Sequence, residues 1–235
     1  MKRIGLVTLL VFVSFLSTAK TVKLAVEDSW PPFADKLGEG ISKSIITKAY
    51  AYSGIEVEYI VVPYARALSM AEQGEVDGAF NVTKQDSTTA IFAFGNEPLL
   101  NVSASFYYPK NSTLNFNTSA DIPSGTKVAT IIGYEYGDGY SKHQHRFLES
   151  RVASQTQIVK LLQSKRVDMA IMFDEVAAHT LEEMGLTEQS IRRGKINHTS
   201  DIYVAFNKRL AGSKKIKNLD VGLKAIRQES AFITP

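Results

Sequence analysis

One helix–strand pattern occurs twice in this chain of 235 residues. Residues 67–80 read ALSMAEQGEVDGAF, and they align without gaps with residues 158–171, which read IVKLLQSKRVDMAI. Each copy has the spacing of an amphipathic helix, a two-residue turn, the dipeptide Val-Asp, and a short buried strand with Ala at the same place. Repeated helix–strand units with short connections predict a parallel sheet. We therefore expect two α/β lobes, one in each half of the chain.

The first 19 residues have the pattern of a secretory signal peptide. Residues 1–3 (MKR) are a basic start, residues 4–16 form an apolar run, and small residues precede a predicted cleavage after Ala19. The run is shorter than the roughly 20 apolar residues that a membrane-spanning helix needs. The chain has no cysteine, so a secreted product relies on its core and not on disulfides. We expect a periplasmic protein.

The mature chain is expected to be nearly neutral. Of 27 Lys and Arg residues, two lie in the signal peptide, which leaves 25 against 24 Asp and Glu residues. No nucleic-acid or anionic-membrane partner is expected from this balance. His143 and His145 are two residues apart, so on a helix they point to different faces and make a poor metal pair. We expect no cofactor and no metal.

The segment after the first predicted strand, Thr21 to Val26, carries acidic and aromatic residues. Pro31 and Pro32 exclude both a helix and a central strand there. The loop therefore projects Glu27, Trp30 and Phe33 from the carboxyl end of the strand, where α/β sheets present groups to ligands. Trp30 is the only Trp of the chain and is interpreted either as a stacking wall for a ligand or as a plug of the sheet end; for Phe33 a plug is favoured.

A polar loop at residues 81–88 is expected to form half of a solute-binding cleft. It follows the strand of the first repeat copy, residues 76–80, and contains Asn, Thr, Lys, Gln, Asp and Ser. Later segments predict a strand crossing between the lobes at residues 101–108, a strand at 126–132 that ends at a Gly-Tyr-Glu-Tyr-Gly turn, and a polar helix at 138–150. They also predict a strand at 167–173 followed by Asp174 as an apparent N-cap, a further strand at 201–206 and a closing helix at 213–229.

These motifs, in this order, resemble the periplasmic solute-binding proteins of the polar amino-acid uptake type (family 3). The marks of the resemblance are Trp30-Pro31-Pro32-Phe33, Gly40, Gly74-x-Val76-Asp77, Phe94 to Pro98, Val128 to Gly133, and Val167 to Asp174. The resemblance implies a two-lobed periplasmic binding protein fold of type II, with a mainly parallel, helix-flanked sheet in each lobe and two hinge strands. It places residues 20–104 and 205–235 in lobe 1 and residues 105–204 in lobe 2.

The resemblance also implies a set of ligand-binding residues. It places Glu27 and Trp30 on one wall, backbone N–H groups of residues 133–136 against a ligand carboxylate, and Asp174 against a ligand ammonium. Where the family's amino-acid binders carry an Arg for the carboxylate, this chain has Thr88, and Glu135 stands where a small hydroxyl residue is common. The candidate ligand-binding residues are Glu27, Trp30, Phe33, Tyr64, Arg66, Thr83, Lys84, Thr88, Gly133, Tyr134, Glu135, Tyr136 and Asp174.

Arg66 and Lys84 are the nearest replacements for the missing Arg. Arg66 follows Pro63-Tyr64 at the start of a helix and is alternatively a surface residue that supports the helix. Lys84 lies in the polar loop itself and would bind an anion as a point charge, with less geometric specificity than an Arg.

Three functions fit these residues. The first is a monomeric binding protein that captures a small polar solute by lobe closure for an ABC importer. The acids Glu27, Asp174 and Glu135 favour an amine or another cationic ligand. The second is a sensory binding protein that presents its closed form to a membrane receptor. The third is an enzyme on the same fold, which would need a positioned acid/base pair in the cleft; we expect a non-enzyme.

Overall fold

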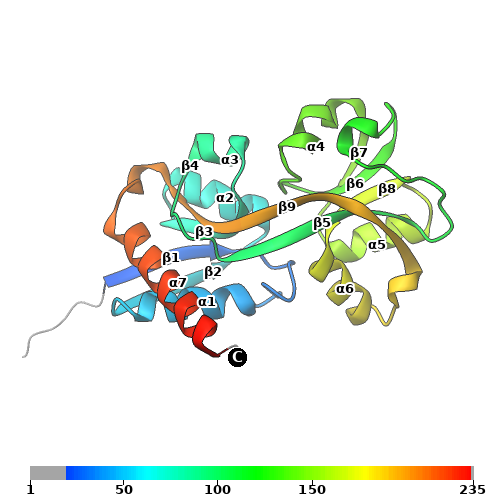
Figure 1. Cartoon of the computed structure of the whole chain (residues 1–235). Helices are drawn as coiled ribbons and strands as arrows, with labels where there is room; N and C mark the ends of the chain where they lie inside the picture. The colour runs from blue at the N-terminus through cyan, green and yellow to red at the C-terminus, as the bar shows by residue number, and fades with distance from the viewer. Residues whose placement is uncertain (1–19, 234–235) are drawn as a thin grey trace, which may run out of the picture.

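The computed structural model describes residues 20–233, so the predicted signal peptide lies outside the described residues. The chain folds into two α/β lobes (Figure 1). The first is built from β1 (Lys20–Val26), α1 (Ile41–Ala51), β2 (Ile55–Val61), α2 (Tyr64–Gln73), β3 (Gly78–Thr83), α3 (Asp86–Ile91), β4 (Phe92–Phe94) and α7 (Lys214–Ile233). The second is built from β6 (Lys127–Ile131), α4 (Asp138–His143), β7 (Leu148–Val152), α5 (Gln155–Gln163), β8 (Met169–Phe173) and α6 (Asp174–Glu183).

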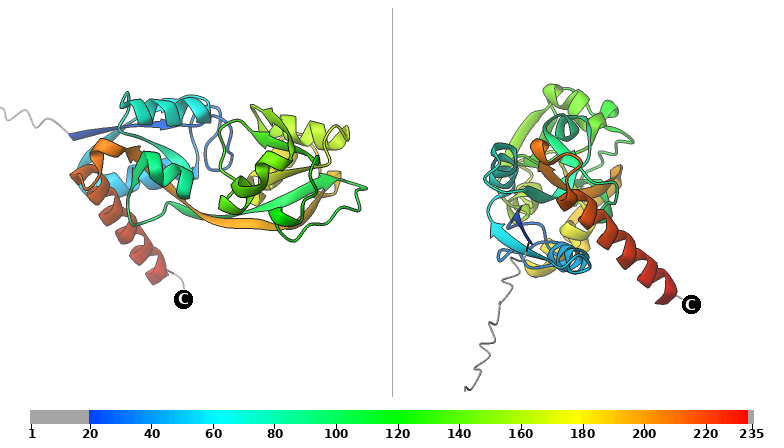
Figure 2. Two further views of the ribbon diagram at one scale, coloured as in Figure 1. Left: turned by 90° about the horizontal axis from the view of Figure 1, so that it is seen from above. Right: turned by 90° about the vertical axis from the view of Figure 1, so that its left-hand side faces the viewer.

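Two long strands connect the lobes. β5 (Leu100–Pro109) and β9 (Ile191–Asn207) pair antiparallel and run side by side from one lobe into the other (Figure 2). They join both halves into one sheet with the order β2-β1-β3-β9-β5-β8-β6-β7, and β4 also pairs with β9. β1 is parallel to β2 and β3, and β6 is parallel to β7 and β8. The predicted fold class, with a mainly parallel core in each lobe and two connecting strands, is confirmed.

The sequence repeat is also a structural repeat. In lobe 1, Asp77 accepts a hydrogen bond of 2.8 Å from the backbone N–H of Lys23, in the middle of β1. In lobe 2, Asp168 accepts one of the same length from the backbone N–H of Lys127, at the start of β6. In both copies the Val-Asp turn that follows a helix is thus tied to the first strand of its own parallel sheet. This requirement explains why the same dipeptide occurs twice.

Two strands extend beyond what the sequence predicted. The polar helix expected over residues 138–150 ends at His143, and residues 148–152 form the edge strand β7. The strand expected at residues 201–206 is the last third of β9, which begins at Ile191. Both missed segments are polar and partly exposed, because one side of an edge or crossing strand faces water. Their side chains therefore lack the apolar alternation by which strands are recognised.

The loop around residues 81–88 is shorter than expected. β3 continues to Thr83 and α3 begins at Asp86, so only Lys84 and Gln85 connect them. The start of α6 also differs from the prediction, because Asp174 is its first residue and Phe173 is its N-cap.

None of the helices in the described part of the chain has the length and hydrophobicity of a membrane span.

The Trp30–Phe33 loop of lobe 1 packs into the core of lobe 2. Trp30 and Phe33 are buried in the cluster that includes Phe106 of β5, Val128 of β6 and Phe173 of β8. The loop contains a cis peptide bond between Pro31 and Pro32. The loop thus forms part of the contact between the lobes. α7, by contrast, packs on α1 within lobe 1, and its carboxyl end points away from the body of the molecule (Figure 2).

Candidate ligand-binding site

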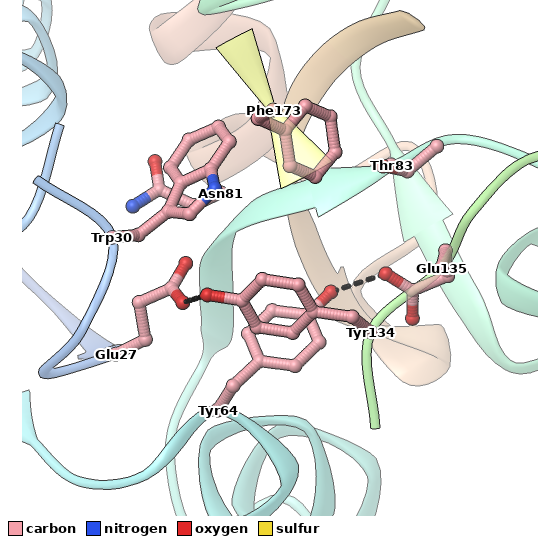
Figure 3. Close-up of a pocket in the computed structure, with 8 residues that line it drawn as sticks. All are labelled: Glu27, Trp30, Tyr64, Asn81, Thr83, Tyr134, Glu135 and Phe173. Carbon is pink, nitrogen blue, oxygen red and sulfur yellow. Dashed lines mark hydrogen bonds between the residues drawn. The ribbon is translucent and has the colours of Figure 1, made fainter. Parts of the chain in front are cut away.

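A small cavity lies between the lobes, and we call it the inner cavity (Figure 3). Lobe 1 and lobe 2 each contribute part of its wall. The lining residues are Glu27, Trp30, Tyr64, Asn81 and Thr83 from lobe 1 and Tyr134, Glu135 and Phe173 from lobe 2. The side chains leave a free volume of about 10 Å³, which is room for about one water molecule. In this conformation the protein's own side chains therefore occupy the cleft.

Two tyrosine–glutamate hydrogen bonds cross the cleft in opposite directions. Tyr134 of lobe 2 donates its hydroxyl to Glu27 of lobe 1. Tyr64 of lobe 1 donates its hydroxyl to Oε2 of Glu135 in lobe 2, at 2.5 Å. The two tyrosine rings meet edge to face with their centroids 4.8 Å apart (Figure 3). Each lobe thus supplies one acid and one donor, and together the pairs form an interlobe latch.

Both carboxyl groups of the latch have raised pKa values. Burial raises the pKa of Glu27 well above its ordinary value; the hydrogen bond from Tyr134 opposes this rise and the nearby charge of Glu135 adds to it. Burial raises the pKa of Glu135 to about 7, against the opposing effect of the Tyr64 hydrogen bond. The inner cavity therefore holds two acids that carry their full negative charge only above neutral pH, unless a positive group comes close.

Asn81 and Trp30 present unused polar atoms at the inner cavity. Asn81 is 5% exposed and Trp30 is 1% exposed. Neither Nδ2 nor Oδ1 of Asn81 has a hydrogen-bond partner of ordinary geometry, although the side chain is close enough to lower the pKa of Glu27. Nε1 of Trp30 also lacks a partner. Buried polar groups are rarely left unpaired, so these atoms mark a place where a ligand or water is expected.

The backbone at Asn81 aims this side chain into the cleft. Asn81 has a left-handed conformation, with φ of 66°, and lies where the register between β3 and β9 shifts from Phe80 to Val82. Asn adopts this conformation more readily than most residues, and bulges of this kind re-aim side chains next to functional sites. Sequence reasoning missed Asn81 and Phe173. The available signal was a polar residue inside an apolar strand for Asn81, and the position before Asp174 for Phe173.

Two further cavities adjoin the inner cavity. A side cavity of about 90 Å³ is lined by residues that include Glu27, Asp28 and Tyr64. An outer cavity of about 310 Å³ is lined mainly by lobe 2, with Gln85 and Ser87 from lobe 1. Tyr134 lines all three cavities. Together the three cavities have the dimensions of a small-molecule site.

Six of the thirteen predicted residues line the inner cavity: Glu27, Trp30, Tyr64, Thr83, Tyr134 and Glu135. Gly133 and Tyr136 line the outer cavity instead. The Tyr136 hydroxyl accepts a hydrogen bond of 2.7 Å from the backbone N–H of Ile131, so it also supports the loop. Phe33 lies behind Trp30 with ring centroids 4.6 Å apart, in agreement with a plug, whereas Trp30 is both a cavity wall and part of the core.

The remaining predicted residues have partners outside the inner cavity. Arg66 pairs with Glu75 at 3.0 Å on the exposed side of α2. Lys84 lies over the ring of Tyr203, with Nζ 4.9 Å from the centroid. Neither therefore stands in the inner cavity as a replacement for a carboxylate-binding Arg.

Thr88 and Asp174 are also held by neighbours. The buried hydroxyl of Thr88 donates to the carbonyl of Thr83 at 2.7 Å, and this residue closes the capping box of α3. Asp174 forms an ion pair with Arg193 of β9 and accepts a hydrogen bond of 2.8 Å from the Tyr107 hydroxyl. Asp174 lines a separate cavity in lobe 2 with these partners and does not line the inner cavity.

The chain is similar in fold to solved periplasmic-type binding proteins. An ancestral arginine-binding protein bound to arginine is 16% identical, with a TM-score of 0.73 over 89% of this chain and 93% of that chain. An amino acid ABC transporter substrate-binding protein from Streptococcus pneumoniae bound to L-arginine is 17% identical, with a TM-score of 0.71 over 89% and 90%. No protein-family model and no curated protein sequence matches the chain.

A histidine kinase sensor domain with similarity to periplasmic binding proteins is also similar, at 15% identity and a TM-score of 0.76 over 91% of this chain and 93% of that chain. At these identities the likeness establishes the fold and leaves the ligand open. The chain therefore has the two-lobed fold of type II periplasmic binding proteins, a fold that serves both solute uptake and sensing.

Proposed function

We propose that this protein captures a small polar solute, amino-acid-like or an amine, between its lobes and delivers it to an ABC importer. The observation that carries the proposal is the inner cavity, whose wall is shared between the lobes and contains unpartnered polar atoms of Asn81 and Trp30. Each unpaired buried group costs about 1–3 kcal/mol. A ligand that bonds these atoms of lobe 1 and also contacts Tyr134, Glu135 and Phe173 of lobe 2 interacts more strongly with the closed arrangement, which couples binding to closure.

Hinge motion is supported by the connecting strands. The pairing of β5 with β9 shifts in register after Ala104 and again after Ser105. Irregular pairing of this kind lets two long strands bend together, and few residues need to change conformation. These shifts lie at residue 104, the lobe boundary on β5 that the family resemblance implies, and they face His198 and Ile196 on β9. The resemblance implies the second boundary near residue 204, where β9 already pairs with β3 of lobe 1. Solute uptake then follows a periplasmic route after removal of residues 1–19.

Two backbone contacts would report closure. The Gly137 N–H donates to Oε1 of Gln85 at 3.2 Å, and the Asp86 N–H donates to Oδ1 of Asp138 at 3.3 Å. These contacts join the start of α3 in lobe 1 to the start of α4 in lobe 2. They do not involve the inner cavity, so they stabilise the closed arrangement without occupying it.

The sensory alternative is supported by the similarity to a histidine kinase sensor domain. Both roles use the same closed form and differ in the membrane protein that recognises it. Cross-linking of the closed protein to membranes of its own cells separates them. A permease with its ATPase identifies uptake, and a receptor identifies sensing. Capture of a small solute, with no chemical conversion, is expected in both cases.

Native mass spectrometry of freshly purified mature protein tests the proposal, followed by a thermal-shift screen of amino acids, polyamines, sugars and organic acids. A ligand that binds only the folded protein raises its melting temperature. We expect a co-purified small solute or a clear thermal shift, with a change in Trp30 fluorescence because Trp30 lines the cavity. If no solute in the screen binds and none co-purifies, the proposed function is wrong.

A further inference from the structure

The lining of the three cavities has an unusual charge balance. The acids Asp28, Glu27, Glu135 and Glu149 are distributed along the side, inner and outer cavities. The only Lys or Arg among the lining residues of these cavities is Arg151, in the outer cavity. Its guanidinium is paired with Glu149, with Nη2 2.6 Å from Oε2. A ligand in this cleft therefore meets acidic side chains in each of the three cavities, and the only cation among the lining residues is paired.

Several N–H groups in and beside the loop that would receive a carboxylate are engaged within the protein. The Tyr134 N–H donates to the carbonyl of Ile131 at 3.3 Å. The backbone of Glu135 hydrogen-bonds to the side chain of the same residue and lowers its pKa against the effect of burial. The Gly137 N–H is bonded to Gln85. With these donors engaged, a carboxylate in the inner cavity would face Glu27 and Glu135 without a positive side chain to compensate, because the unpartnered donors there, Nε1 of Trp30 and Nδ2 of Asn81, are neutral.

The aromatic residues of the inner cavity suit a positive group. Trp30 meets Phe173 edge to face at 5.2 Å, and Tyr64 meets Tyr134 in the same way at 4.8 Å. Four rings thus surround the space between the two acids (Figure 3). The faces of aromatic rings attract ammonium and guanidinium groups, and this attraction grows when water is excluded.

Asn81 gives an independent indication of a ligand. Its side chain is nine-tenths or more buried, lines the inner cavity and has no hydrogen-bond partner for Oδ1. Oδ1 can accept a hydrogen bond from an ammonium or guanidinium N–H, and Nδ2, which is also unpartnered, can donate to an acceptor atom of a ligand. Asn81 therefore indicates that a ligand binds here, and the acids and the aromatic rings indicate its charge.

We propose that the ligand is an organic cation without a carboxylate, such as a diamine or a guanidino amine. Its positive groups replace the tyrosine hydroxyls on Glu27 and Glu135, and its chain extends past Tyr134 into the neighbouring cavities. The inference rests on the proposed capture function and names its substrate class. The Tyr64 and Tyr134 hydroxyls, which now satisfy the two acids, hold the cleft closed when this ligand is absent.

Matched pairs of ligands that differ only by one carboxylate test the inference. These are putrescine and ornithine, cadaverine and lysine, and agmatine and arginine, each titrated into the full mature protein by calorimetry at pH 8. We expect at least one amine to bind about tenfold or more tightly than its amino acid, because the carboxylate meets uncompensated acids. An amino acid that binds as tightly as its amine, or more tightly, overturns the inference.

The outcome also separates this inference from the proposed function. If a neutral or acidic solute binds and no amine does, the substrate class is wrong and the capture function stands. If no solute binds at all, the capture function fails as well. Glu27→Gln and Glu135→Gln should each weaken amine binding about tenfold or more, because Gln keeps the shape and removes the charge. Glu72→Gln, at an exposed position of α2, is the matched control and should leave amine affinity unchanged. Equal affinities in all three variants would contradict the inference.

Discussion

Replacing Glu135 with Gln should remove a measurable part of the pH dependence of stability. Glu135 faces Tyr64 of α2, and Glu27 at the end of β1 is the other acid that acts on the cavity. Gln keeps an oxygen that accepts the Tyr64 hydroxyl but cannot ionise. The substitution therefore separates the charge of the latch from its hydrogen bond.

The size of the effect follows from the pKa of Glu135, which burial raises from 4.5 to about 7. Because the folded pKa is the higher one, the group stabilises the fold fully below the unfolded pKa, and this stabilisation is lost as the pH rises through about 7. Between pH 5 and pH 8 the loss amounts to about 2.5 kcal/mol. The Gln variant does not lose this contribution, so its advantage over the parent protein should grow with pH.

Urea unfolding at pH 5, 6, 7 and 8, followed by Trp30 fluorescence and far-UV circular dichroism, measures the difference. Glu27 keeps its own raised pKa in the variant, so part of the pH dependence should persist. Glu72→Gln, at an exposed position, serves as the control for removing one acid. If the stability curves of the parent and of Glu135→Gln run parallel from pH 5 to pH 8, Glu135 is not a buried acid of the kind described and the reasoning fails.

Further predictions concern closure and binding. Gly133→Ala should weaken ligand binding about tenfold or more, because a Cβ there would lie 3.0 Å from Cβ of Ala65 in the other lobe. Gly125 has nearly the same positive φ but open space around it, so Gly125→Ala should cause the same backbone strain without a steric contact and should leave ligand affinity intact. Equal losses of affinity for the two variants in a calorimetric titration would refute this. Amine affinity should rise between pH 6 and pH 8 as Glu135 ionises, with proton release measured in buffers of different ionisation enthalpy, and a flat profile would contradict it. Asp174→Asn should lower the free energy of unfolding by about 1–3 kcal/mol while amine affinity stays unchanged, because its ion pair lies outside the inner cavity.

The elements that carry apolar periodicity could be predicted from the sequence. The helix and strand around each Val-Asp dipeptide, and the long crossing strand β5, lie close to their expected places. β7 and the first part of β9 could not be predicted in this way. Their backbone groups form hydrogen bonds with neighbouring strands while many of their side chains face water. The local hydrophobic pattern of the sequence therefore carries little information about these strands.

The candidate site was predictable only in part, for a similar physical reason. Glu27 and Trp30 follow a recognisable strand, so their place at the cleft could be inferred from local sequence. The partners of Asp174 could not, because Arg193 is on a different strand and meets it only in the folded lobe. Asn81 was also missed, since its unpaired state depends on how two distant lobes meet.

The burial of Trp30 in the second lobe has a kinetic consequence. Separating the lobes would withdraw this side chain from the cluster around Phe173 and expose it to water. A Trp side chain buries about 150–250 Å² in all, and part of the area of Trp30 is covered by Phe33 of its own loop. The remainder, at about 25 cal/mol per Å², still makes opening unfavourable, so open molecules would be a minority. Solute association should accordingly reach a plateau at high concentration, where the rate of spontaneous opening, and no longer diffusion, determines how fast the protein loads.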